Sequence, residues 1–306
     1  MTAVSPRQFK TAFDDEQHPR PSLRWLEQGF AFEISSSDSL LLEMARRIFA
    51  VQSMAGCDAV TRSWTVEQVD VGGDARWLVS GGSAGSPMTP AYEKNREMAL
   101  LDIEHDALEW LANNSGDTIA VHAALLSKNG KGVVIVGPSF AGKSTLATAL
   151  WRNGWSLMSD DMVFIDTLAR VASPAPRRVS LRFESRELVG DSIWSQIRNS
   201  PSCVQTSKGL YFHPHEVSGM EKVRTTSLSA IFFLARRDTA TDPAAVSAMN
   251  PAKGSLSLLP YAFNARTLPF VDGLRRITPL LDQVPAFDLG RGDLPSMVDS
   301  VETTVG

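Results

Sequence analysis

Residues 132–161 read GVVIV (132–136), GPSFAGKST (137–145), LATALWRNG (146–154) and WSLMSDD (155–161). The apolar run before the first glycine predicts a buried strand, and the run after Lys143, which holds no glycine or proline before residue 154, predicts a helix. A second short apolar run ends in two carboxylates, Asp160 and Asp161. We therefore expect a strand, a glycine-rich loop, a helix, a turn and a second strand, around which the rest of the chain is organised.

The composition is that of an ordinary globular protein, with 43% apolar and 21% charged residues in a chain of 306. Its net charge of −4 offers no basic field for nucleic acid. No apolar run approaches the roughly eighteen residues of a membrane span, and the polar N-terminus does not resemble a signal peptide. We expect a cytoplasmic protein without nucleic-acid or membrane partners. Cys57 and Cys203 lack metal-type spacing and are expected to be free thiols.

The flanking segments suggest three parts: a flexible tail (1–22), a smaller N-terminal α+β region (23–90) and a P-loop domain (91–306). Apolar periodicity in the N-terminal region predicts strands and one helix that begins at Asp38 or Ser39. The strands are expected at 30–34, 64–71 and 76–79, with a hairpin turn at 72–74 and the helix through residue 49. The Gly/Ser/Pro-rich residues 81–90 are expected to form a flexible loop or a domain boundary.

The P-loop domain is expected to open with a long helix over residues 92–113. A strand at 119–126 and the strand at 133–136 are joined by an Asn-Gly turn, which predicts an antiparallel pair. Further strands are expected at 162–165, 179–183, 210–212 and 230–234, followed by helix, short strand and helix. Since few helices separate these strands, the sheet is expected to be mixed within an α/β fold.

The loop itself fits the phosphate-binding pattern G-x-x-x-x-G-K-[ST], in the required context of a strand before it and a helix after it. The pattern is matched by Gly137, Pro138, Ser139, Phe140, Ala141, Gly142, Lys143 and Ser144. Backbone N–H groups and the helix N-terminus would hold phosphate oxygens, Lys143 would lie against the β- and γ-phosphates, and the Ser144 hydroxyl would bind Mg²⁺. One departure is Phe140, which stands where many such loops carry glycine and either narrows the loop or stacks beside a nucleotide.

The carboxylates Asp160 and Asp161 follow the helix at the end of the next strand. A carboxylate there can reach a metal ion or an incoming nucleophile. Adjacent residues of a regular strand point to opposite faces, so two functional roles require a bulge or a site at the strand end. Otherwise only one of the pair acts in chemistry, and the plainest alternative is a solvated turn.

Five segments together resemble the kinase core of the HPr kinase/phosphorylase family, in particular its stand-alone serine kinase relatives. They are HAA (122–124), GPSFAGKSTLATAL (137–150), GWSLMSDD (154–161), PAPRRVSLRFES (174–185) and TSKGLYFHP (206–214). The resemblance covers about residues 92–235 and is loose before them. It implies a PEP-carboxykinase-like P-loop fold with a mixed sheet.

The resemblance also implies roles for individual residues. One of Asp160 and Asp161 would be the base toward an acceptor hydroxyl, and the other would assist Mg²⁺. The implied phosphate-binding residues are Gly137, Gly142, Lys143, Ser144 and Thr145. The implied catalytic residues are His122, Lys143, Asp160 and Asp161; the implied magnesium ligands are Ser144, Asp160 and Glu184. Lys208 and His213 would also line the site.

These features predict an ATP- and Mg²⁺-dependent kinase that phosphorylates a hydroxyl, with a serine of a small protein or peptide as the expected acceptor. Peptide natural-product precursors belong to this class. Arg177, Arg178 and Arg182 are candidates for offsetting the developing charge. Arg182 and Phe183 replace the relatives' lysine and asparagine, and the family's glycine-rich segment after the glutamate has no counterpart, which argues against HPr as the substrate.

Two alternatives stay open: a small-molecule kinase acting on an amino acid or sugar, and a nucleotide-gated binding module without turnover. All three are compatible with a homo-oligomer.

Overall fold

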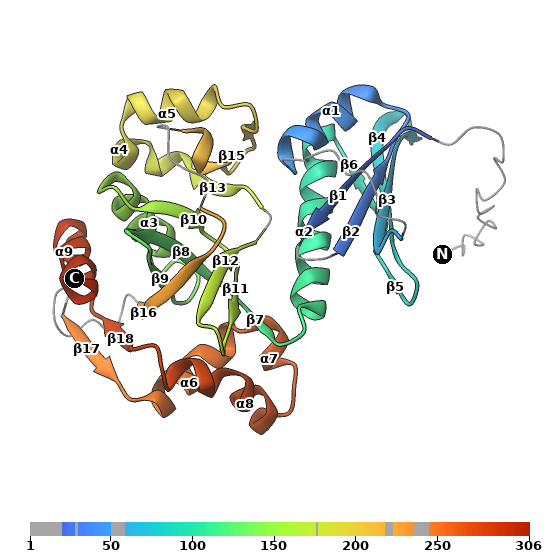
Figure 1. The fold of residues 1–306 in the computed structure, drawn as a ribbon. Coiled ribbons are helices and arrows are strands. Elements are labelled where there is room, and N and C mark those ends of the chain that lie inside the picture. Colours follow the sequence, from blue (N-terminus) through green and yellow to red (C-terminus); the bar gives the residue numbers. More distant parts are fainter. Residues whose placement is uncertain (1–19, 28–29, 50–58, 176, 218–222, 235–244) are drawn as a thin grey trace, which may run out of the picture.

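The computed structural model describes residues 20–27, 30–49, 59–175, 177–217, 223–234 and 245–306. These residues form a six-stranded N-terminal sheet, a nine-stranded central sheet and a three-stranded sheet, with helices packed on them (Figure 1). The central sheet contains both parallel and antiparallel pairs, so the expected mixed α/β fold is confirmed. Most of the expected tail and Cys57 lie outside the described residues.

The N-terminal sheet buries one face, as the alternating pattern predicts. Trp25, Phe32 and Trp64 stack on that face with ring centroids 5.4–5.9 Å apart. Helix α1 (Ser39–Ile48) covers the core and is capped by Asp38, whose side chain accepts from the backbone N–H of Leu41. The strands are β1 (Ser22–Glu27), β2 (Phe30–Ser35), β3 (Arg62–Val71), β4 (Asp74–Ser83), β5 (Ser86–Pro87) and β6 (Ala91–Glu93).

The prediction of a flexible loop at 81–90 is wrong, because strand β4 continues to Ser83 and turns into β5. Gly81 and Gly82, which suggested a loop, instead allow neighbouring strands to approach closely. A Cβ on Gly81 would lie 2.2 Å from the Ser63 carbonyl oxygen, and one on Gly82 would lie 2.6 Å from that of Ser86. Both also have positive φ, 155° and 121°, which glycine adopts without strain.

Strand β9 (Lys131–Val136), which leads into the loop, lies inside the central sheet between antiparallel β8 and parallel β16. Val133 and Ile135 face one hydrophobic core, while Val134 and Val136 face another. Burial on both faces explains the uninterrupted apolar run. The other strands are β7 (Thr118–Val121), β8 (Ala123–Lys128), β10 (Ser156–Ser159), β11 (Val163–Asp166), β12 (Val171–Pro174), β16 (Thr226–Leu234), β17 (Val246–Met249) and β18 (Ala286–Leu289).

The single strand expected at 119–126 is two strands that break at His122. Strand β7 pairs with β11, whereas β8 pairs with β9 and β10. The backbone N–H of His122 leaves the ladder and donates to the carbonyl of Tyr261 at 2.8 Å. Because both strands are buried, the apolar pattern runs on without marking the break, which presents the His122 side chain at a strand end.

Helices cover both faces of the central sheet (Figure 1). Helices α3 (Lys143–Arg152) and α9 (Leu294–Val305) share one core with the three-stranded sheet, and α6 (Pro251–Leu258), α7 (Phe263–Arg266) and α8 (Phe270–Leu281) share the other. The expected C-terminal order of helix, strand and helix is confirmed. The small sheet holds β13 (Val179–Arg182), β14 (Val204–Gln205) and β15 (Gly209–Phe212), next to α4 (Arg186–Val189) and α5 (Asp191–Arg198).

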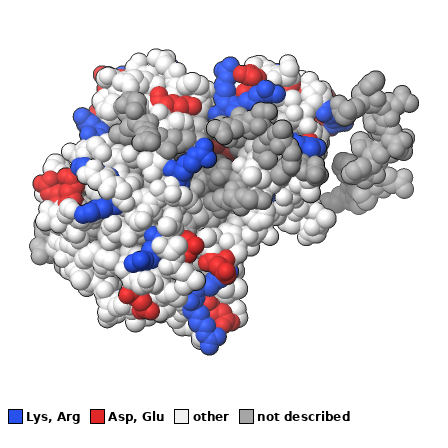
Figure 2. Space-filling model, in the orientation of Figure 1, with Lys and Arg blue, Asp and Glu red and all other residues white. Residues whose placement is uncertain are grey.

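Helix α2 (Arg96–Asn114) connects the two parts of the chain. Its Leu100, Ile103 and Leu111 lie in one core with Trp64 of β3 and Phe164 of β11. The domain boundaries therefore stay a prediction. Within the described residues, none of the helices is both long and apolar enough to cross a bilayer. Figure 2 shows acidic and basic side chains interspersed over the described part of one face.

Candidate functional site

The segment between β9 and α3 joins a buried strand directly to a helix N-terminus. Gly142, the N-cap of α3, has φ 100° and supplies no side-chain acceptor to the helix. A Cβ at Gly137 would lie 3.1 Å from the Cβ of Leu234, so the loop passes close to β16. The N-terminal N–H groups of α3 are thus left for an outside acceptor, which suits an anion.

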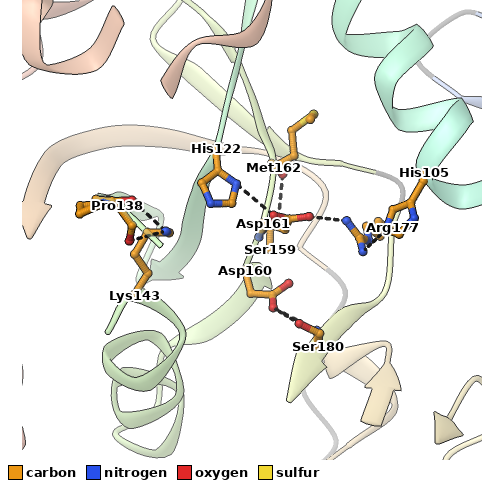
Figure 3. Close-up of polar contacts among 11 residues, drawn as sticks. His105, His122, Pro138, Lys143, Ser159, Asp160, Asp161, Met162, Arg177 and Ser180 are labelled. Atoms are coloured by element: carbon orange, nitrogen blue, oxygen red, sulfur yellow. Dashed lines mark hydrogen bonds and ion pairs between the residues drawn. The ribbon is translucent and has the colours of Figure 1, made fainter. Parts of the chain in front are cut away.

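Lys143 is folded back onto this loop and is only 7% exposed. Its Nζ donates to the carbonyl oxygens of Gly137 at 2.8 Å and Pro138 at 3.3 Å (Figure 3). Burial lowers the pKa of Lys143, and the charges of Asp161 and Asp160 oppose that shift. The ammonium group therefore lies within electrostatic reach of the two carboxylates.

A pocket of about 560 Å³ opens beside the loop. Phe140 lies at its rim with φ 65° and 76% of its surface exposed, so its ring is not packed into the loop. Arg182 lies over that ring, 5.0 Å from its centroid. The lining comprises Phe140, Ala141, Gly142, Lys143, Ser144, Thr145, Leu146, Arg182, Glu184, Ser185, Leu188, Arg291, Gly292, Leu294 and Met297. Ser144, Thr145 and Glu184 thus line one pocket, whereas His122, Asp160 and Asp161 are not among its lining residues.

Asp160 and Asp161 lie at the end of a strand. Adjacent residues of a regular strand would point to opposite faces, but at a strand end both side chains can take part in one site. The register of β10 shifts between Leu157 and Ser159, and the chain leaves the sheet after Ser159. The Ser159 hydroxyl closes the turn by donating to the Met162 carbonyl at 2.7 Å. The two carboxylates consequently point to different partners (Figure 3).

Two basic side chains, His122 and Arg177, bind the carboxylate of Asp161. Its Oδ1 lies 3.0 Å from Nδ1 of His122, and its Oδ2 accepts from Arg177. Burial alone would raise the pKa of Asp161, but the hydrogen bond from His122 and the charge of Arg177 outweigh it and lower the pKa. Asp161 is therefore ionised at neutral pH, with its side chain still 36% exposed.

Asp160 has the opposite environment. Burial and then the charge of Asp161 raise its pKa to about 6. Its Oδ2 accepts from both the backbone N–H and the hydroxyl of Ser180, at 3.0 and 2.9 Å. No basic side chain pairs with Asp160 among the described residues. Such a carboxylate would be stabilised in its ionised form by a nearby cation.

Three of the residues named from sequence lie elsewhere. Arg178 cannot meet a substrate, because it forms a buried bidentate pair with Glu104. His213 directs its Nε2 to the Ile48 carbonyl at 2.6 Å, in contact with the end of α1. Lys208 lies exposed in a turn, within electrostatic range of a histidine of α2.

Three other residues belong to the site although sequence reasoning did not single them out. His105 of α2 lies 2.9 Å from Arg177. Ser180 binds Asp160, and Arg291 donates to the carbonyl of Ala141 in the loop. Each reaches the site from a distant part of the chain, and none carries a motif. For Ser180 alone a signal existed, since it lies in the segment 174–185 that resembles the kinase family.

No protein-family model and no curated protein matches this sequence. Among solved structures, the chain is similar to the Hpr(Ser) kinase/phosphatase from Coxiella burnetii, with 16% identity over 61% of this chain and 87% of that one. The TM-score is 0.34, which is too low to carry an argument about this chain. The site has to be judged from its own geometry.

Proposed function

We propose that this chain is an ATP- and Mg²⁺-dependent kinase that transfers the γ-phosphoryl group to a hydroxyl, with a serine of a peptide or small protein as acceptor. The observation that carries the proposal is the meeting of a phosphate-binding loop with a pair of unlike carboxylates. The ammonium of Lys143 is influenced by Asp161 and Asp160 at once, while their pKa values move in opposite directions. Carboxylates with separated pKa values commonly have separate chemical roles.

The nucleotide phosphates would take the place of the loop carbonyls around Lys143. The Nζ now donates to Gly137 and Pro138, and a phosphate oxygen is a stronger acceptor for a charged donor. The Gly142 N-cap leaves the first N–H groups of α3 directed at the same anion. ATP would thus be held by the loop, with the nucleoside extending into the adjoining pocket.

Asp160 and Ser144 have the oxygen donors that Mg²⁺ requires. The fit rests on Asp160, a buried carboxylate that forms no ion pair with a basic side chain among the described residues; burial and then the charge of Asp161 raise its pKa. Glu184 is exposed, lines the same pocket as Ser144 and is the third candidate. When bound, Mg²⁺ would neutralise charge on the phosphate oxygens.

Asp161 is the better candidate for the base. It is ionised, partly exposed and oriented by His122 and Arg177. The acceptor oxygen would bond to the γ-phosphorus as the bond to the β–γ bridging oxygen breaks, its proton passing to the Asp161 carboxylate and ADP leaving. Arg182, exposed at the pocket, is the arginine placed to offset charge in the transferring group.

The test is phosphoryl transfer with a pool of serine-containing peptides, ATP and Mg²⁺, following phosphopeptides by mass spectrometry and ADP by a coupled assay. Wild type should form both. Asp161→Asn should lower the rate about 100- to 10,000-fold, the usual contribution of a general base, with the dissociation constant for ATP unchanged. Lys143→Ala should weaken ATP binding.

Other results would point elsewhere. Transfer to free amino acids or sugars, with none to peptides, would make the chain a small-molecule kinase. ATP binding without ADP formation for any acceptor would make it a binding module. Full transfer activity in Asp161→Asn would refute the assigned mechanism.

A further inference from the structure

Consecutive residues of helix α2 bind consecutive arginines next to the catalytic carboxylates. Glu104 pairs with Arg178 at 2.6 and 3.0 Å, with both side chains at most 1% exposed. Nε2 of His105 lies 2.9 Å from a terminal nitrogen of Arg177 (Figure 3). Two adjacent positions of α2 thus hold two adjacent positions of the segment that leads into β13.

The next residue of α2 attaches to the opposite part of the molecule. Asp106 accepts a bidentate pair from Arg62 at 2.7 and 2.8 Å and a further hydrogen bond from the indole of Trp64 at 2.8 Å. Arg62 and Trp64 belong to β3 of the N-terminal sheet. Because successive helical residues point about 100° apart, one turn of α2 can bind both sides.

The segment held by α2 positions both carboxylates. Arg177 binds Asp161, and three residues later Ser180 binds Asp160 through its N–H and its hydroxyl. Arg177 is only 11% exposed, and its Nε is buried without a hydrogen-bond partner among the described residues. Its guanidinium therefore depends on two contacts, Asp161 on one side and His105 on the other.

We propose that His105 is a positioning residue of the phosphoryl-transfer site, which acts through Arg177 to fix Asp161 and thereby ties the geometry of the base to α2 and the N-terminal sheet. The inference rests on the proposed function for its catalytic consequence. The positioning itself concerns only the contact between His105 and Arg177, and it can be measured without any turnover.

The contact requires a neutral imidazole. Arginine only donates, so Nε2 must accept and the ring proton must lie on Nδ1. The His105 side chain is exposed on α2, and its partial desolvation there together with the charge of Arg177 lowers its pKa; Glu104 and Asp161 oppose the shift, and Lys208 adds to it. His105 is consequently neutral at pH 7, and its protonation at lower pH would replace the hydrogen bond by repulsion between two cations.

The first experiment observes the Arg177 side chain by NMR in protein labelled with ¹⁵N-arginine. The signals of Arg177 are identified because they disappear in the variant Arg177→Lys. In wild type we expect rotation of the guanidinium about its Nε–Cζ bond to be slowed. His105→Ala should speed this rotation several-fold, and His105→Gln, whose amide oxygen reaches about as far as Nε2, should restore it. Glu109→Ala, an exposed position one turn along α2, is the matched control and should leave it unchanged.

The second experiment measures phosphoryl transfer in the same four proteins. His105→Ala should lower kcat about tenfold with the KM for ATP unchanged, and His105→Gln should recover to within threefold. As the pH is lowered, kcat should fall less in His105→Gln than in wild type, because glutamine does not titrate. Thermal unfolding of each variant shows that the fold is intact.

The two experiments test different claims, so that each claim can be refuted without the other. Unchanged Arg177 rotation in His105→Ala, or no recovery in His105→Gln, would refute the positioning role. Absence of transfer in wild type would refute the proposed function while the NMR result decides the contact. Full kcat in His105→Ala, despite a freed Arg177, would show that the contact does not serve catalysis.

Discussion

The buried pair of Glu104 and Arg178 supports a quantitative prediction about stability. Both side chains are fully buried, and the pair joins α2 to the segment whose Arg177 and Ser180 bind Asp161 and Asp160. Replacing Glu104 by glutamine keeps the shape but removes the negative charge. Arg178 cannot lose its proton. The glutamine oxygen can still accept one of its hydrogen bonds, and the Ser202 carbonyl lies 3.4 Å away, but neither oxygen carries a negative charge.

Removing one partner of a buried ion pair costs about 3–5 kcal/mol, because the other charge stays buried without compensation. We expect Glu104→Gln to cost about 4 kcal/mol, in the middle of this range, since an arginine cannot neutralise itself. Arg178→Met should cost less, because the Glu104 carboxyl can take up a proton. Replacing both residues, with Glu104→Met and Arg178→Leu, should bring stability back to within about 1 kcal/mol of wild type.

Urea unfolding of the four proteins, followed by tryptophan fluorescence, measures these differences. Total stabilities of folded domains are about 5–15 kcal/mol, so a loss near 4 kcal/mol is large and easily resolved. A loss below 1 kcal/mol for Glu104→Gln would refute the reasoning. So would a double variant as unstable as the worse single one, because the cost would then come from lost packing and not from an unpaired charge.

Three further predictions concern the loop and the buried carboxylate. Arg291→Ala should weaken ATP binding about 10- to 100-fold, because a hydrogen bond from a charged group at the pocket is worth about 1.5–3 kcal/mol. Calorimetry measures the affinity, and an unchanged value would exclude Arg291 from the site. Phe140→Gly should change that affinity less than threefold, because the ring lies outside the loop, and a large gain would show that it obstructs binding. Burial raises the pKa of Asp160 to about 6, above its ordinary 3.8, so this group's contribution to stability is present in acid and is lost as pH rises through 6. Asp160→Asn should therefore stabilise the protein at pH 8, by up to about 3 kcal/mol, and by about half as much at pH 5; destabilisation at pH 8 in urea unfolding would contradict this.

The sequence was informative about the central strand–loop–helix unit, whose pattern is local, although the equally local glycine pattern at 81–90 predicted a loop where β4 and β5 lie. The loop at 137–144 was predicted because its glycines, its lysine and its flanking apolar runs are all local features. The position of Asp160 and Asp161 at a strand end followed from chain order. The break at His122 was missed, because β7 and β8 are both buried and the apolar run does not show where the chain changes partners.

The remaining contacts of the site depend on tertiary structure. His105 lies 72 positions before Arg177, and Arg291 lies 150 positions after the Ala141 carbonyl that it binds. No local spacing links such residues. For the same reason Arg178 looked available for catalysis, since its partner Glu104 occupies an ordinary helical position whose burial becomes visible only when α2 is packed.

The central claim is that the phosphate loop and the two aspartates form one site. A crystal structure with Mg²⁺ and a non-hydrolysable ATP analogue tests it most directly. The account predicts that Nζ of Lys143 leaves the carbonyls of Gly137 and Pro138 for the phosphates, with the γ-phosphate facing Asp161. Lys143 still bound to those carbonyls at saturating nucleotide, or a γ-phosphate directed away from Asp161, would contradict it.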